Sequence, residues 1–194
     1  MATGLKVGIV ATIGAGTLGG AGGIYYLTLN KNIKDTLTDK GIKLISESAE
    51  DGVWTIAFKE NKNSSELTGL NPQITNFSTL KTWCTTNCKE SSRKETELKK
   101  VEKLCLIPPS TISEKLEKDK RVYVENWETK LDAIKKDPQK LAKLKAVDND
   151  KFSNIESASN GKDELKSWCE VQKENQLNPA NYEETYRKIV DLCV

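Results

Sequence analysis

The chain carries the same short motif twice. The sequence Leu-Lys-Thr-Trp-Cys at residues 80–84 recurs as Leu-Lys-Ser-Trp-Cys at residues 165–169. Each copy is followed by a charged stretch that ends in a Leu-Cys pair, whose cysteine is Cys105 in the first copy and Cys193 in the second. Only 4 Trp and 5 Cys occur among the 194 residues, so a match that uses both types in each copy predicts a tandem duplication.

The cysteines of the two copies form natural pairs, Cys84 with Cys105 and Cys169 with Cys193. A disulfide in each pair would join two antiparallel helices and close a loop of about 20 residues, contributing on the order of 3 kcal/mol through the entropy of the unfolded chain. The alternative is four buried thiols in a reducing compartment. The fifth cysteine, Cys88, has no counterpart in the second copy. We expect it to be a free thiol or an alternative partner for Cys105.

Two of the four tryptophans, Trp83 and Trp168, occupy the same place in the repeat. An exposed Trp can anchor a binding partner, but both lie beside a predicted disulfide on an apolar helix face, so core packing is the favoured interpretation. Trp54 and Trp127 precede them by 29 and 41 residues and are taken as loosely equivalent. The residues expected in the repeat core are Trp83, Trp168, Leu104, Leu192 and Trp127.

Beyond residue 76 the chain is expected to be mainly helical. Residues 111–114, Thr-Ile-Ser-Glu, form a capping box that opens a long charged helix, expected to end before Pro138. Residues 178–179, Asn-Pro, are an N-cap and first-turn proline that should begin the last helix. Upstream, the apolar run 53–58 fits either a short strand or a buried helix. The other expected helices are 78–88, 95–106, 139–147 and 163–176, with a polar loop at 148–160.

Residues 7–29 are a stretch of 23 residues without a charge that contains 7 of the 12 glycines. Residues 14–19 match the Gly-x-Gly-x-x-Gly phosphate-binding fingerprint after an apolar run. However, no second strand and no acidic strand end follow at the distance that a dinucleotide-binding fold requires. We therefore favour a membrane segment over a phosphate loop.

A membrane anchor from Val7 to Leu29 is long enough to span a bilayer. Gly16, Gly20 and Gly23 belong to small-x-x-x-small patterns, which let helices approach closely in a membrane or are simply tolerated there. A cleavable signal peptide is the alternative. The predicted fold is mainly α: an N-terminal transmembrane helix followed by a tandem helical-hairpin repeat ectodomain. The predicted divisions are an anchor at 1–29, a juxtamembrane segment at 30–46, and repeat units at 47–108 and 109–194.

After residue 29 the charges are numerous and balanced, with 29 basic and 28 acidic residues among 165. This balance argues against a nucleic-acid partner, which requires a basic excess on one face. The chain has no His, the commonest general base and metal ligand, so neither an enzyme nor a cofactor or metal site is expected. An enzyme would need acids such as Glu183, Glu184 and Asp191 with Tyr186, which on a helix are better explained as a solvated face.

These features together resemble the small paralogous surface proteins of haemotropic mycoplasmas. Chains of that family begin with a Gly/Ala-rich apolar segment, here 4–29, and continue with Trp-containing stretches and Leu-Lys-x-Trp-Cys motifs. A Cys followed by a Pro-x-Thr-x-Ser-x-x-Leu type element corresponds to Cys105 and residues 109–116. Cys88 and the strand-like run 53–58 depart from the family pattern. The resemblance implies a membrane-anchored surface protein, in host-cell contact or antigenic diversity, with no catalytic residues to carry over.

The leading hypothesis is thus a non-enzymatic, single-pass cell-membrane protein whose C-terminal domain is extracellular. Its partners would be the membrane and a host-cell surface component or paralogous proteins. The alternative is a cytoplasmic, membrane-tethered scaffold or assembly protein with reduced cysteines. Positive charges next to the anchor favour cytoplasmic retention, although long domains translocate largely regardless of such charges. These charges are Lys31, Lys34, Lys40 and Lys43.

Overall fold

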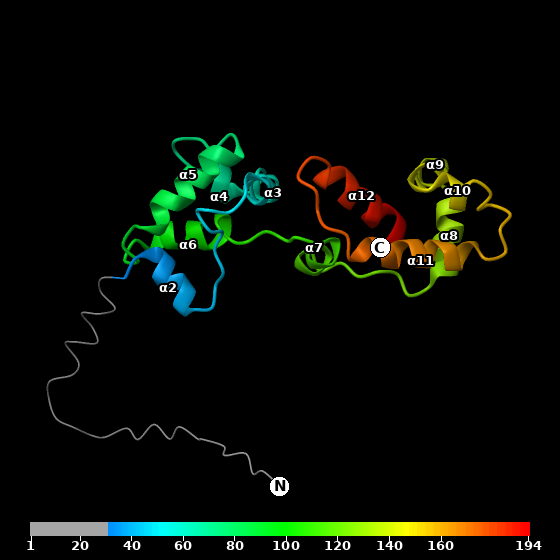
Figure 1. Ribbon diagram of the computed structural model, residues 1–194, viewed down its shortest axis with the longest axis horizontal. Coiled ribbons are helices and arrows are strands. Elements are labelled where there is room, and N and C mark those ends of the chain that lie inside the picture. The colour runs from blue at the N-terminus through cyan, green and yellow to red at the C-terminus, as the bar shows by residue number, and fades with distance from the viewer. Residues whose placement is uncertain (1–30) are drawn as a thin grey trace, which may run out of the picture.

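The computed structural model describes residues 31–194, which fold into two helical lobes arranged along the long axis of the molecule (Figure 1). The predicted membrane anchor at 1–29 lies outside the described residues. Within residues 31–194, none of the helices combines the length and the apolar character needed to cross a membrane. Extended backbone pairs there only as isolated bridges, so the described fold is helical, as expected.

The first lobe, here called unit 1, is followed by an extended linker and the second lobe, unit 2 (Figure 1). Unit 1 contains α2 (Ile33–Asp39), α3 (Asp51–Asn61), α4 (Ser65–Thr68), α5 (Phe77–Cys88) and α6 (Glu95–Leu104). Unit 2 contains α7 (Ile112–Lys118), α8 (Trp127–Lys136), α9 (Pro138–Val147), α10 (Asn149–Phe152), α11 (Gly161–Lys173) and α12 (Tyr182–Cys193).

In both units, two equivalent backbone hydrogen bonds join the start of the first helix to the residues that follow a later helix. In unit 1 the N–H of Ile33, at the start of α2, donates to the carbonyl of Glu90 at 2.9 Å, just after α5. The N–H of Ser92 donates back to the carbonyl of Lys31 at 3.0 Å. The equivalent bonds of unit 2 run from Ile112 to Asn175 at 3.1 Å and from Leu177 to Ser110 at 2.8 Å.

This shared pattern moves the start of unit 1 back to residue 31. Helix α2 is the counterpart of α7: each has 7 residues, and each is followed by a left-handed residue, Gly41 (φ 77°) or Lys120 (φ 55°). Ile33 and Leu37 of α2 are fully buried in the core of unit 1. Residues 31–46 therefore belong to the repeat, and the predicted separate juxtamembrane segment at 30–46 is corrected. The sequence comparison missed it because little beyond one Ile and one Leu recurs in α7.

Each unit has its own hydrophobic core, and α3 contributes to both. Trp54 and Ala57 lie in the core of unit 1, whereas Ile56 lies in the core of unit 2. Residues two apart on a helix project to nearly opposite sides. The apolar run 53–58 is thus a helix covered on two sides, which explains why its pattern resembled a buried strand.

The long helix expected from Thr111 to Pro138 is two helices. Its predicted capping box is present, since the Thr111 hydroxyl accepts from the Glu114 N–H at 3.2 Å. Helix α7 then ends at Lys118, and the extended segment that follows brings the Val124 N–H to the Cys193 carbonyl at 3.1 Å. Unit 1 has the same contact between Ile45 and Cys105 at 2.9 Å, so the break is part of the repeat.

Two further expectations were wrong. The segment 148–160, predicted to be a polar loop, contains α10, and its Phe152 and Ile155 are fully buried. The last helix begins at Tyr182, with Asn181 as its N-cap residue, and not at Pro179. The Pro179 carbonyl instead accepts a hydrogen bond from Lys59 of α3 at 2.6 Å, which holds the segment before α12 against unit 1.

Leu37→Ala tests whether α2 is part of unit 1. Because Leu37 is fully buried, the substitution should lower the free energy of unfolding of unit 1 by about 2–5 kcal/mol, measured by urea titration. Lys34→Ala, on the exposed side of the same helix, is the matched control and should change it by less than about 0.5 kcal/mol. Equal, small effects would mean that α2 does not stabilise the unit.

Candidate functional site

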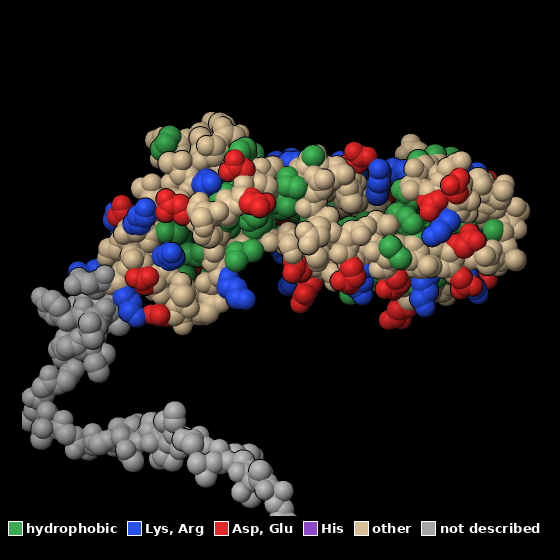
Figure 2. All heavy atoms as spheres, viewed as in Figure 1, with side chains coloured by type: hydrophobic (Ala, Val, Ile, Leu, Met, Phe, Trp, Pro, Cys, Tyr) green, Lys and Arg blue, Asp and Glu red, His purple; other side chains and the backbone are tan. Residues whose placement is uncertain are grey.

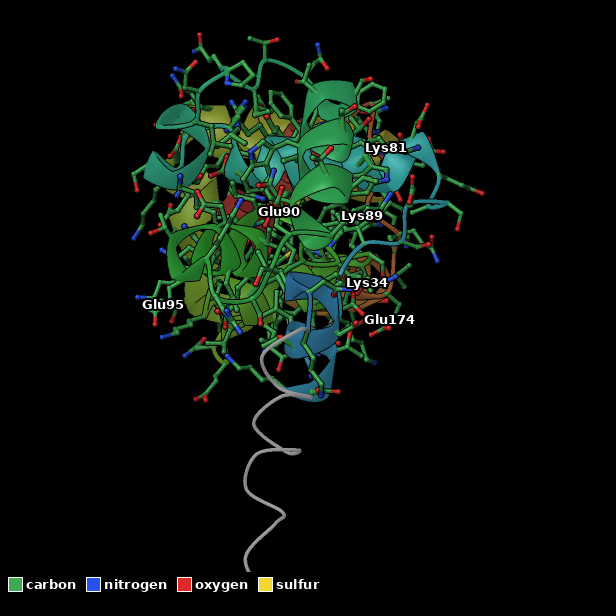
Figure 3. The ribbon with its side chains drawn as sticks, turned by 90° about the vertical axis from the view of Figure 1, so that its left-hand side faces the viewer. Lys34, Lys81, Lys89, Glu90, Glu95 and Glu174 are labelled. Atoms are coloured by element: carbon green, nitrogen blue, oxygen red, sulfur yellow. A yellow bond between two sulfur atoms is a disulfide. The ribbon has the colours of Figure 1, made fainter. Side chains whose placement is uncertain are left out.

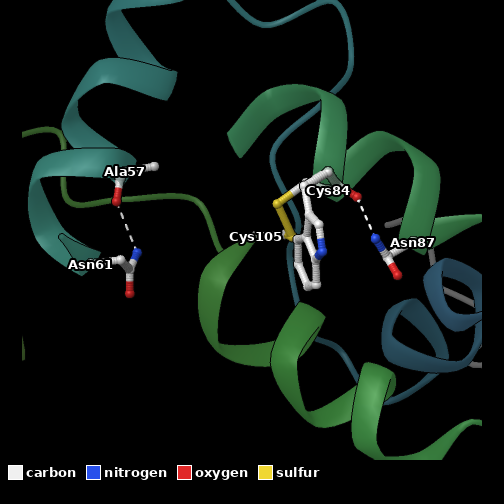
Figure 4. The surroundings of a disulfide bond; sticks show 6 residues. Ala57, Asn61, Cys84, Asn87 and Cys105 are labelled. Carbon is white, nitrogen blue, oxygen red and sulfur yellow. Dashed lines mark hydrogen bonds between the residues drawn. A yellow bond between two sulfur atoms is a disulfide. The ribbon is translucent and has the colours of Figure 1, made fainter. Parts of the chain in front are cut away.

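Each unit is closed by one disulfide between its last two helices. Cys84 of α5 is bonded to Cys105 after α6, and Cys169 of α11 is bonded to Cys193 of α12, with 5.8 Å between the Cα atoms in both pairs. Figure 4 shows the first of these bonds between α5 and α6. All four cysteines are at most 1% exposed. The structure thus joins the two pairs that the repeat predicts.

The predicted core residues divide into a buried and a half-buried group. Leu104, Leu192 and Trp168 are buried, and the Trp168 ring meets Phe152 edge to face at 6.3 Å. Trp83 and Trp127 are only half-buried at the edges of their cores. The two motif tryptophans therefore share a position in the sequence but not an environment.

Trp54 and Trp127 lie on equivalent helices, because α3 packs against α5 as α8 packs against α11. Their positions on those helices differ. Trp54 lies within α3 and is 1% exposed, whereas Trp127 is the first residue of α8, where its ring meets Tyr123 edge to face at 6.3 Å. The two tryptophans therefore lie on equivalent helices but not at equivalent positions of those helices.

Cys88 is the free thiol expected from the sequence, one helical turn beyond Cys84. It is half-buried, and burial raises the pKa of the Cys88 thiol, with the charges of Lys34 and Lys89 acting in the opposite direction. Both lysines are labelled in Figure 3, on the end of unit 1. Since the thiolate is the reactive form, a raised pKa makes Cys88 a poor nucleophile at neutral pH. Its alternative pairing with Cys105 is not adopted.

The junction between the units contains an ionic network that the sequence did not predict. Glu60, on the last turn of α3, has a side chain that is only 6% exposed. Its carboxylate lies 2.6 Å from Lys118 Nζ and 3.1 Å from Lys115 Nζ, both on α7, and accepts a hydrogen bond from the Tyr182 hydroxyl on α12. One carboxylate of unit 1 thus contacts two helices of unit 2.

Burial alone would raise the pKa of Glu60. The hydrogen bonds from Lys118 and Tyr182, together with the charges of the two lysines, outweigh burial and hold the pKa below its usual range. The same balance holds for Asp119, which follows α7. Burial raises its pKa, but hydrogen bonds from Lys115 (2.6 Å) and Tyr186 (2.7 Å) outweigh burial and lower the pKa below its usual range. Both carboxylates are therefore ionised at neutral pH.

The acids considered as catalytic candidates are not brought together. Glu183 pairs with Lys62 across the junction at 2.5 Å. The other two pair within unit 2, Glu184 with Lys188 at 2.8 Å and Asp191 with Lys143 at 2.5 Å. In the described range 31–194, no three Cys, Asp or Glu side chains gather in a way that could hold a metal ion.

Removing one disulfide should destabilise its unit. The double variant Cys84→Ser/Cys105→Ser should lose about 3 kcal/mol of unfolding free energy, because the unfolded chain regains the freedom of a 21-residue loop. Cys88→Ser is the control and should leave the stability within about 0.5 kcal/mol of the parent. If Cys88→Ser proved the more damaging change, Cys88 and not Cys84 would be the partner of Cys105.

Glu60→Gln should weaken the junction in a pH-dependent way. At pH 7 it should cost about 1.5–3 kcal/mol, the usual contribution of hydrogen bonds to a charged group. Because the folded-state pKa of Glu60 is lowered, its stabilising effect is complete above its unfolded pKa of about 4.5 and disappears as pH falls through the folded pKa. The stability difference between parent and variant should therefore shrink on acidification.

The control for this prediction is Glu183→Gln, which removes an ion pair across the same junction. Its carboxylate is 44% exposed, so the change should cost less than about 1 kcal/mol at any pH. Urea titrations at pH 7, 5 and 3 would measure both variants. If Glu60→Gln lowered the free energy of unfolding by the same amount at every pH, the ionised form of Glu60 would not be what stabilises the junction.

Comparisons of the chain with protein-family models, with curated proteins and with solved structures find no match. The resemblance carried by the Leu-Lys-x-Trp-Cys motifs therefore stays a prediction from the sequence.

Proposed function

We propose that this chain is a non-enzymatic, single-pass surface protein whose two disulfide-closed helical units lie outside the cell, in host-cell contact or as a variable surface antigen. The observation that carries the proposal is the pair of disulfides. Such bonds form and persist in oxidising surroundings and are rare in a reducing cytosol. An extracellular location is consistent with both of them.

The surface of the two units supports the same proposal. Basic and acidic side chains are interspersed over the face seen in Figure 2, with no large area of one sign. Mixed charge of this kind keeps a domain soluble and does not attract a polyanion such as nucleic acid. The uncharged N-terminal segment and the family resemblance add the membrane anchor and the surface role, both as inferences from the sequence.

The small size of each core explains why the disulfides would be retained. A unit of about 80 residues buries a modest apolar area, and domains of this size often depend on covalent cross-links. In a reducing cytosol the same units would lose that contribution. The alternative function, a cytoplasmic membrane-tethered scaffold, would therefore require them to fold with four reduced cysteines.

Trapping thiols at lysis of the cells that make the protein tests its location. We expect Cys84–Cys105 and Cys169–Cys193 to be recovered as disulfide-linked peptides, and Cys88 as the one alkylated cysteine. In parallel, protease added to intact cells should degrade the described domain. Five alkylated cysteines and a protected domain would overturn the proposal in favour of the scaffold.

A further inference from the structure

We propose that an uncharged groove along α5 of unit 1 binds a neutral saccharide. The groove has a volume of about 350 Å³ and lies between α5 and the loop that precedes it. In a chain with 30% charged residues, none of the residues that line it is charged. Two parallel rows of side chains at four-residue spacing form its helical wall: Ser78, Thr82 and Thr86, and Thr79, Trp83 and Asn87.

The repeat shows that this groove is specific to unit 1. In unit 2 the equivalent tryptophan, Trp168, is 8% exposed because Phe152 of α10 covers it. The segment that carries α10 is longer: equivalent residues are 79 apart before it (Ile33 and Ile112) and 85 apart after it (Cys84 and Cys169). Unit 1 lacks those six residues, and its Trp83 is less deeply buried, at the edge of an open groove.

The polar side chains have also diverged between the two helices. Residues 85 positions after Ser78, Thr79 and Thr86 are two acids and an exposed valine on α11. The two acids give this face of α11 a charge that the groove on α5 does not have. The counterparts are Asp163, Glu164 and Val171.

The groups in the groove match the hydroxyls of a sugar. The Thr82 hydroxyl donates to the Ser78 carbonyl at 3.1 Å, so its oxygen is oriented as an acceptor. The Thr79 hydroxyl donates to the Asn76 carbonyl at 2.8 Å and accepts from the Asn76 N–H at 3.3 Å, so only one lone pair of its oxygen remains for a ligand. Asn87 donates its side-chain N–H to the Trp83 carbonyl at 2.9 Å, a bond drawn in Figure 4, which orients its amide. Fixed acceptors of this kind suit a ligand that presents several hydroxyl donors.

Trp83 packs against the core of unit 1, and the part of its side chain that lines the groove adds apolar surface to the site. The face of an aromatic ring carries a partial negative charge, and the C–H faces of a pyranose are weakly positive, so the two stack favourably. The buried Ile74 also lines the groove and adds apolar surface. The volume lies at the lower end of the usual range for small-molecule sites, about 300–1,000 Å³, so only a short segment of a glycan would be bound.

Two other ligand classes fit less well. An anionic glycan or phosphate would be expected to meet lysine or arginine, and the groove contains neither. A proline-rich peptide is bound in grooves lined by several aromatic rings, whereas Trp83 is the one aromatic residue lining this groove. The groove combines an uncharged, mainly apolar lining with a few oriented acceptors, and a saccharide with apolar C–H faces and hydroxyl groups is the neutral ligand that fits both.

Ligand binding should be measured with the full-length chain in a detergent that has no sugar headgroup. The probes are chitotriose, maltotriose and lacto-N-tetraose, with 3′-sialyllactose and decaproline as the competing classes, followed by saturation-transfer NMR and calorimetry. We expect at least one neutral oligosaccharide to bind. Thr82→Lys, which places a charge in the groove, should weaken that binding by about tenfold or more.

Matched variants separate loss of the site from loss of the fold. Thr82 is exposed, so Thr82→Lys should remain folded, and Ser167→Lys at the exposed equivalent position of α11 should bind as the parent does. Trp83→Ala should also lose binding, while Trp127→Ala should not. Three results overturn the proposal: no neutral probe binds, Thr82→Lys binds as well as the parent, or decaproline or sialyllactose binds more tightly than every neutral probe.

The inference deepens the proposed function by naming a ligand class, and it rests on that function for its setting at a host-cell surface. Binding of the parent and of Thr82→Lys to host cells distinguishes failure of the saccharide site from failure of the surface function. Equal cell binding by both would overturn the saccharide site and leave the surface function standing. Saccharide binding in solution by a protein whose domain is protected inside the cell would support the site and overturn the surface function.

Discussion

The disulfide in each unit is the constraint around which the rest of the fold is arranged. It holds the last two helices together, and the carbonyl of its second cysteine accepts a hydrogen bond from the extended segment after the first helix. That hydrogen bond, to the carbonyl of Cys105 or Cys193, fixes the end of the first helix of the unit. The start of the same helix is hydrogen-bonded to the residues that follow α5 or α11, the helix that carries the first cysteine of the disulfide. Because a small domain buries a smaller fraction of its surface than a large one, this covalent closure supplies stability that a larger core would provide by packing.

The parts of the fold that could be predicted were those encoded by rare residues or by local capping. The cysteine pairs and the capping box at Thr111 are of this kind. What could not be predicted depends on tertiary contacts. Phe152 is a core residue in a polar segment, and the left-handed residue that follows α7 is Lys120, where a sequence analysis would look for Gly. Helix α3 was ambiguous because it faces two cores, a situation that no single-helix periodicity describes.

The candidate sites were less accessible to sequence analysis than the fold. The Glu60 network joins residues more than 50 positions apart, and nothing in the local sequence distinguishes Glu60 from the other acids. The groove on α5 left a signal that could have been used. Helix α5 has one charged residue, Lys81, in a chain where nearly every third residue is charged. The significance of this low charge depends on Trp83 being less buried than Trp168, a difference that is visible only in the folded units.

The junction between the units is head-to-tail, since different surfaces of the repeat meet there. Contacts of this type can in principle add copy after copy and build a fibre. The surfaces left at the two ends carry other side chains. Helix α8, the counterpart of α3, ends in Lys135 and Lys136 where α3 has Glu60, and Lys94, the N-cap residue of α6, stands at the position of Tyr182. Asp39 in turn stands at the position of Lys118. The Glu60 network is therefore not repeated between the free ends, and a further copy added head to tail would meet there through ion pairs of reversed sign.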